Sequence, residues 1–262
     1  MFIANVQPVG DQANAESSSQ PLDTSAGLQL PPTQDVTHDA VVVRGTLLTQ
    51  DDLLKMHVLK KNKILKEIEE SWESTTTLIH WKEMPLIIEG IFPLSKVIAD
   101  MAAFQRNYGQ TTGGIPIVWY CGLHPDAANA NRDMHCSFIR QLVQQHQFNL
   151  GAIGIDFNQL EEYHEATLFE VVVYLASQLP NTSRLYIFID NVIFYERTEG
   201  NNSAKDAEEA LLRFAGLSTR PEVNAVVKVF FTDPPHDGRI TDYFRQNGKV
   251  LKFKSNGWGY ME

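Results

Sequence analysis

The sequence has too few cysteines, too few basic residues and no apolar run long enough for several classes of protein. Its 262 residues include only two cysteines, Cys121 and Cys136, so a disulfide framework is excluded and a reducing, cytoplasmic location is expected. No apolar run approaches the ~18 residues that cross a bilayer. Residues 1–20 have neither the basic nor the apolar region of a secretory signal. The net charge of −10 argues against nucleic-acid or membrane partners, because neither attracts an acidic surface.

Common catalytic and metal-binding patterns are also missing. The chain has no G-x-S-x-G and no H-E-x-x-H sequence, so serine-hydrolase and zinc-protease chemistry have no support. Cys121, His124, His135 and Cys136 invite a zinc interpretation. Against it, His135 and Cys136 are adjacent on a predicted helix and point about 100° apart. We therefore expect no metal site, and we interpret these four residues as structural.

Composition divides the chain into three parts. Residues 1–40 are rich in Gln, Ser, Pro, Asp and Ala, and such a segment buries too little apolar surface to offset its ordering entropy, so a disordered tail is predicted. Residues 41–80 form a leading helical segment, in which Thr49 caps an amphipathic helix, or two, reaching Trp72. Residues 81–262 form the core domain.

Short apolar runs alternate with amphipathic stretches through the core domain, and each run predicts a buried strand. Helices are expected between these strands, so the pattern predicts an α/β fold of three α-β-α layers around a five-stranded, mainly parallel sheet. Ligands of such sheets bind at the carboxyl ends of the strands. The predicted strands lie at residues 86–88, 115–121, 185–191, 225–232 and 249–253, and the predicted helices at residues 96–108, 131–145, 167–179, 204–215 and 240–246.

A partial phosphate-binding loop follows the first predicted strand. The spacing of Gly90 and Lys96 matches the G-x-x-x-x-G-K-[ST] template. Ser95 occupies the second glycine position, and Val97 replaces the hydroxyl residue that would hold magnesium. The alternative for Lys96 is a lysine at a helix start that extends to solvent. This partial match supports a nucleotide site only if the other motifs of such a site follow later in the sequence.

Those companions are polar residues at the ends of later strands. Asp190 closes an apolar run, as a magnesium-holding Walker B carboxylate does. Asn191 follows it where hydrolysis usually needs a second carboxylate. Thr232 ends the next strand, where a group that senses the γ-phosphate would lie. Each also has a structural interpretation, because Asp-Asn and Thr-Asp-Pro-Pro sequences are common turns.

In order and spacing, these motifs resemble the NACHT-type (nephrocystin-3-like) P-loop NTPase domain of fungal STAND proteins, which are signal-transducing relatives of AAA ATPases. The resemblance covers about residues 72–255. It rests on the loop at residues 86–97, the aromatic strand Val-Trp-Tyr-Cys at 118–121, the helix at 136–142, the Walker B strand at 185–192 and the sensor strand at 227–240. It implies a vestigial nucleotide site made of Gly90, Ser95, Lys96, Val97, Asp190 and Thr232.

The departures from the family pattern point to lost catalysis. Val97 removes the magnesium-binding hydroxyl, Asn191 removes the second carboxylate, and Asp233 replaces a sensor arginine and would repel a γ-phosphate. The resemblance then implies a pseudoenzyme that binds no cofactor, or ATP or GTP only weakly, and acts on a protein partner as an interaction or regulatory module. The alternatives are a working ATP- or GTP-binding switch with slow hydrolysis, and a truncated product without a function of its own.

Overall fold

The structure is a computed structural model of the chain. It describes residues 36–81, 87, 90–124, 127–196, 202–233, 238–253 and 260–261. The predicted disordered tail lies outside these residues as far as residue 35. The first helix, α1 (Val36–Arg44), begins before the boundary predicted at residue 40.

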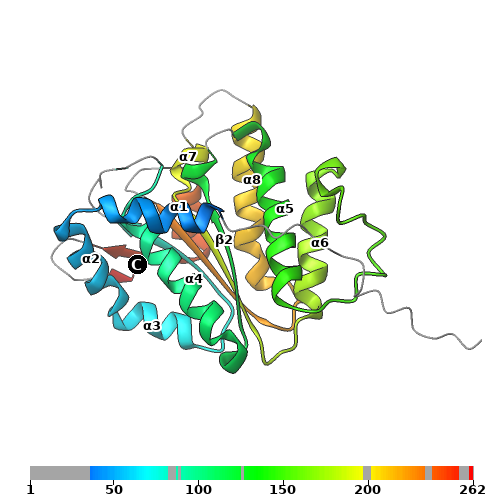
Figure 1. Cartoon of the computed structure of the whole chain (residues 1–262), viewed down its shortest axis with the longest axis horizontal. Coiled ribbons are helices and arrows are strands. Elements are labelled where there is room, and N and C mark those ends of the chain that lie inside the picture. The colour runs from blue at the N-terminus through cyan, green and yellow to red at the C-terminus, as the bar shows by residue number, and fades with distance from the viewer. Residues whose placement is uncertain are drawn as a thin grey trace, which may run out of the picture.

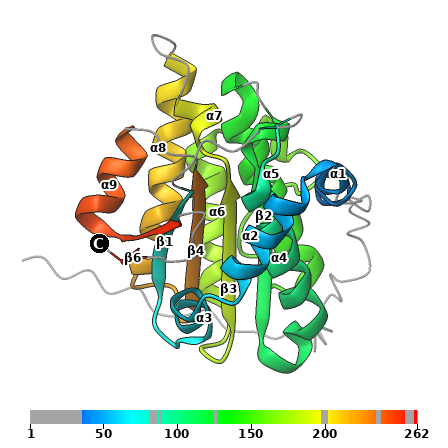
Figure 2. The same cartoon turned by 90° about the vertical axis from the view of Figure 1, so that its left-hand side faces the viewer.

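A parallel sheet forms the centre of the molecule, as predicted. Five strands run parallel, and the short sixth strand pairs antiparallel with the fifth, in the order β2-β3-β4-β1-β5-β6. Figure 2 shows β1, β4, β3 and β2 side by side. The strands are β1 (Thr75–Trp81), β2 (Gly114–Tyr120), β3 (Arg184–Asp190), β4 (Val226–Asp233), β5 (Lys249–Phe253) and β6 (Tyr260–Met261).

The first strand was predicted in the wrong place. It is β1, Thr75–Trp81, within the segment that was expected to be helical. The threonines at its start made it look polar, although β-branched residues favour strands. Of the predicted run at residues 86–88, only Ile87 is described, and it lies outside any strand. The described strand before the phosphate-loop candidate therefore ends at Trp81.

Helices cover both faces of the sheet, which gives the predicted three layers (Figure 1). On one face lie α1, α2, α3 and α4, and on the other lie α5, α6, α8 and α9, each group with its own buried apolar cluster. The helices after α1 are α2 (Gln50–Lys60), α3 (Lys63–Glu70), α4 (Pro93–Thr112), α5 (Ala127–Gln145), α6 (Glu165–Gln178), α7 (Ile193–Glu196), α8 (Asn202–Gly216) and α9 (Arg239–Asn247).

Side chains alternate between the two apolar clusters along each strand, because successive residues of a strand point to opposite faces. In β3, Ile187 belongs to the cluster on the α5 side and Phe188 to the cluster on the α4 side. Both are fully buried. The continuous apolar run that predicted this strand is thus explained by burial on both faces.

The leading segment confirms the predicted cap. Thr49 accepts a hydrogen bond from the Asp52 amide at 3.1 Å, and the Asp52 carboxylate accepts one from the Thr49 amide at 3.2 Å. This reciprocal pair satisfies two amides that a helix start leaves without partners. The amphipathic pattern divides into α2 and α3, because Asn62 caps a second helix through the Leu65 amide.

The chain continues on different faces of the sheet after β1 and after its neighbour β4. After β1 it passes to α4 on one face, and after β4 it passes to α9 on the opposite face. In open α/β sheets, ligands bind at such a switch point, outside the carboxyl ends of the strands. Among the described helices, none is long and apolar enough to span a membrane.

Candidate functional site

Three polar side chains from distant parts of the chain meet at the carboxyl ends of β3 and β4. Asp190 ends β3 and is fully buried. One of its oxygens accepts a hydrogen bond from the Ser95 hydroxyl at 2.6 Å, and the other accepts one from the Thr232 hydroxyl. Both carboxylate oxygens are therefore occupied by protein donors.

Each hydroxyl is itself held by a backbone amide. Ser95 lies in the first turn of α4, and its oxygen accepts a hydrogen bond from the Phe92 amide at 3.1 Å. The oxygen of Thr232 accepts one from the Asn191 amide at 2.9 Å. Ser95 and Thr232 thus have fixed orientations, and together they tie the start of α4 to the ends of two strands.

The environment of Asp190 opposes its charge. Burial is the largest cause and raises the pKa, the Ser95 and Thr232 hydrogen bonds lower it, and the neighbouring Asp233 carboxyl raises it again. The resulting pKa of Asp190 is about 7, against an ordinary value of 3.8. Near neutral pH this carboxyl is therefore divided between its protonated and ionised forms, because desolvation disfavours the charged one.

Asn191 continues the polar cluster with an unusual backbone. Its φ is +60°, a left-handed conformation that Asn adopts more readily than most residues. Its side-chain nitrogen donates to the Gly90 carbonyl at 3.4 Å, while its Oδ1 is buried without a hydrogen-bond partner in the described part of the chain. Asn191 therefore links the end of β3 to the segment that precedes α4.

Gly90 allows two loops to touch. Its φ is +85°, and a Cβ built on it would lie 2.0 Å from the carbonyl oxygen of Gly122. A Cβ on Gly122 would lie 1.8 Å from the Gly90 carbonyl oxygen in turn. Since both positions exclude any side chain, the segment before α4 rests directly on the turn that follows β2. Gly90 was among the predicted site residues and Gly122 was not, because its sequence signal is only a glycine just after a buried strand.

Lys96 does not join this cluster. Its amine forms an ion pair with Asp100, one turn along α4, and Asp100 also binds Lys60 from α2. Burial raises the pKa of Asp100, but the hydrogen bonds from both lysines lower it further, so the net pKa lies below the ordinary value. Because neighbouring helix residues point about 100° apart, Lys96 points to Asp100 while Ser95 points to Asp190 at the end of β3.

The remaining predicted positions are buried and serve different purposes. Val97 is fully buried in the apolar cluster on the α4 side. Asp233, at the end of β4, is also fully buried and acts on Asp190 through its charge. The residue of the loop template whose hydroxyl binds the Walker B-like carboxylate is therefore Ser95, although the template assigned this role to the position of Val97.

A magnesium nucleotide does not fit these groups as they stand. P-loop NTPases hold magnesium between a loop hydroxyl and the Walker B carboxylate, while the loop lysine binds the phosphates. Here Ser95 and Asp190 bind each other and Lys96 is paired with Asp100. In this arrangement, the hydrogen bonds of Asp190 with Ser95 and Thr232 fasten the start of α4 to the sheet.

The cysteine and histidine residues weighed as zinc ligands are separated. His124 stacks on Trp119 with ring centroids 3.9 Å apart, whereas His135 lies between Phe169 and Phe214. Among the described residues, no three His, Cys, Asp or Glu side chains are grouped so that they could hold a metal ion.

The chain matches no family model, and a search of the curated proteins finds no match.

Proposed function

We propose that this chain is a protein of P-loop NTPase architecture that does not hydrolyse nucleotides and acts as an interaction or regulatory module. A NACHT-type domain of a fungal STAND signalling protein is the proposed origin. The observation that carries the proposal is the closed cluster around Asp190, in which Ser95 and Thr232 occupy both carboxylate oxygens. The partner is a protein, and the location is the cytoplasm, which suits the two free, buried cysteines.

We expect no hydrolysis because phosphoryl transfer depends almost wholly on positioning and electrostatic stabilisation. A lysine held by Asp100 provides no charge to a phosphate at the Ser95 side of α4. The Asp233 carboxyl adds negative charge beside Asp190. A single charge-assisted contact is worth about 1.5–3 kcal/mol, and ordering a triphosphate consumes most of that. We therefore expect ATP and GTP to bind with a dissociation constant in the millimolar range or weaker.

One observation favours a second candidate, a slow ATP- or GTP-binding switch. Ser95 and Asp190 are the pair of groups, hydroxyl and Walker B carboxylate, between which P-loop proteins hold magnesium. Opening this single hydrogen bond would free both ligands. The two candidates differ in whether magnesium increases nucleotide affinity.

Titration calorimetry with ATP and GTP, with and without magnesium, tests the proposal. We expect no hydrolysis, a millimolar or weaker dissociation constant and no effect of magnesium. Lys96→Ala should leave this weak binding unchanged, because Lys96 belongs to the ion pair with Asp100. Lys63→Ala is the matched control, since Lys63 forms the same type of pair with Glu67 on an exposed helix face. Micromolar, magnesium-dependent binding that Asp190→Asn abolishes would instead establish the switch.

A further inference from the structure

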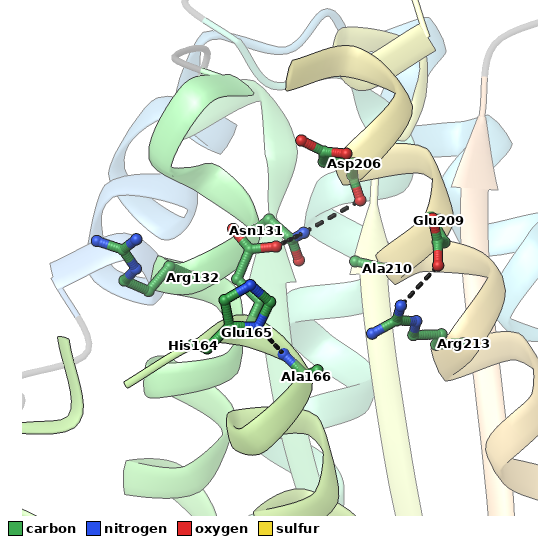
Figure 3. A pocket seen from close by; sticks show the side chains of 9 residues that line it. All are labelled: Asn131, Arg132, His164, Glu165, Ala166, Asp206, Glu209, Ala210 and Arg213. Carbon is green, nitrogen blue, oxygen red and sulfur yellow. Dashed lines mark hydrogen bonds and ion pairs between the residues drawn. The ribbon is translucent and has the colours of Figure 1, made fainter. Parts of the chain in front are cut away.

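A second polar site lies on the other side of the sheet. A cavity of about 260 Å³ opens where α5, the first turn of α6 and α8 meet (Figure 3). By volume it corresponds to on the order of nine water molecules, so it suits a small metabolite rather than a nucleotide. Its wall includes Asn131 of α5, Glu165 and Ala166 of α6, and Asp206, Ala210 and Arg213 of α8.

Asn131 is the residue of this wall that indicates a ligand. Asn131 is buried, with only 5% of its surface exposed. Its nitrogen donates to a Glu165 carboxylate oxygen at 2.5 Å and to the Asp206 carbonyl at 3.1 Å. Its Oδ1 has no hydrogen-bond partner in the described part of the chain. Figure 3 shows this side chain between α6 and α8, above Ala166 and Ala210.

An unpaired buried acceptor costs on the order of 1–3 kcal/mol, and a donor from the cavity removes this cost. The adjacent Glu165 carboxylate makes a cationic donor the best partner, because charge-assisted hydrogen bonds are about twice as strong as neutral ones. An ammonium group has three N–H donors and no acceptor. The Asn131 end of the cavity therefore suits a primary ammonium group.

The opposite part of the wall carries positive charge. Arg213 donates to Glu209 at 2.6 Å through one nitrogen, and a guanidinium has five N–H donors, so others remain available for a second carboxylate. The N-terminal end of α6 lies at the Glu165 side of the cavity, where His164 caps it by accepting from the Ala166 amide at 3.3 Å. The Arg132 guanidinium points away from Asn131 in Figure 3.

We propose that this cavity binds a free α-amino acid, with the ammonium group at Asn131 Oδ1 and Glu165 and the carboxylate at Arg213. This site shares no residue with the cluster at Asp190, so the proposal does not depend on the proposed regulatory role. If both hold, the protein is a regulatory module that senses a small molecule. A carboxylate beside a buried unpaired acceptor, and a guanidinium in the same small cavity, are together the features that a zwitterion requires.

Calorimetry on the full chain tests the site with L-alanine, L-serine, L-leucine and L-glutamine as separate probes. We expect at least one to bind with a sub-millimolar dissociation constant. Its N-acetyl derivative, which lacks the ammonium group, and its α-amide, which lacks the carboxylate, should each bind at least tenfold more weakly. Absence of binding by all four probes overturns the proposal, and so does equal binding of either derivative.

Variants locate the binding. Ala166 is exposed and lines the cavity, so Ala166→Phe should fill the cavity and abolish binding without loss of fold. Thr167 is also exposed but does not line the cavity, so Thr167→Phe should leave binding unchanged. Arg213→Gln should weaken binding tenfold or more. Arg220→Gln is its control, since the two arginine side chains are similarly exposed, at 40% and 38%. Undiminished binding by Ala166→Phe would exclude this cavity as the site.

Discussion

At pH 8, Asp190→Asn is expected to unfold at a higher denaturant concentration than the unmodified protein. Burial and the Asp233 carboxyl raise the pKa of Asp190, against the lowering by its two hydroxyl partners, to about 7 in the folded state. In the unfolded chain the carboxyl has its ordinary pKa near 3.8. An amide has the same shape and no charge, and it can accept from one hydroxyl and donate to the other.

The sign follows from proton binding. Below the unfolded pKa both states are protonated, and there is no effect. Between the two pKa values only the unfolded state is ionised, so stability falls as pH rises, and the loss levels off above about pH 7. Because one pKa unit corresponds to about 1.4 kcal/mol, the full loss is on the order of a few kcal/mol.

Urea unfolding between about pH 4 and pH 9 measures this difference. The variant should be close to the unmodified chain at the acid end of the range, should gain stability over it as the pH rises from about 4 to 7, and should keep that advantage above pH 7. The exposed Asp133 offers a control, since Asp133→Asn changes a charge without changing a buried site. A variant that is less stable than the unmodified chain at pH 8 would show that Asp190 is stabilised as an anion.

Gly90→Ala should be the more damaging of two alanine substitutions at left-handed glycines. Gly90 has a φ of +85° and Gly154 a φ of +65°, so each substitution costs about 1–2 kcal/mol for the backbone alone. The added methyl group has open space at Gly154, but at Gly90 it meets the Gly122 carbonyl oxygen at 2.0 Å. Backbone must move to relieve that overlap, and a total loss of roughly 4 kcal/mol or more is expected.

Thermal and urea unfolding of both variants, with Gly122→Ala as the reciprocal test, give the comparison. Gly122→Ala should behave like Gly90→Ala, because its Cβ meets the Gly90 carbonyl oxygen at 1.8 Å. Equal losses for Gly90→Ala and Gly154→Ala would mean that the two loops are not in contact in solution.

Local sequence patterns were sufficient to predict most of the fold. β2, β3 and β4 were found because burial on both faces leaves a nearly continuous apolar run. β5 was predicted as a short, edge-like strand, and two of its five residues are only partly buried. The first strand was missed because its burial comes from pairing with β4 and β5 at the other end of the chain. The threonines at its start resemble a loop until those partners are known. The more apolar run at residues 86–88 took its place in the prediction.

The candidate site was predicted only in part. Asp190 and Thr232 were identified because both end strands that lie side by side. For Lys96 a phosphate role and a lysine at a helix start both stayed open, because a spacing template does not reveal where a helix begins. With α4 starting at Pro93, the side chain of Lys96 pairs with Asp100, one turn further along the same helix. The contact of Gly90 with Gly122 joins two loops and leaves no local pattern in either.

The central position of β1 has a consequence for how the chain folds. Its hydrogen-bonded neighbours are β4 and β5, and 153 positions separate Ser74 from its partner Val227. Such distant pairing costs loop-closure entropy before it gives any contact, so it slows folding. During synthesis β1 leaves the ribosome long before its partners and stays unpaired with its apolar residues exposed. We therefore expect the nascent chain to need protection from aggregation until the last third of the sequence has emerged.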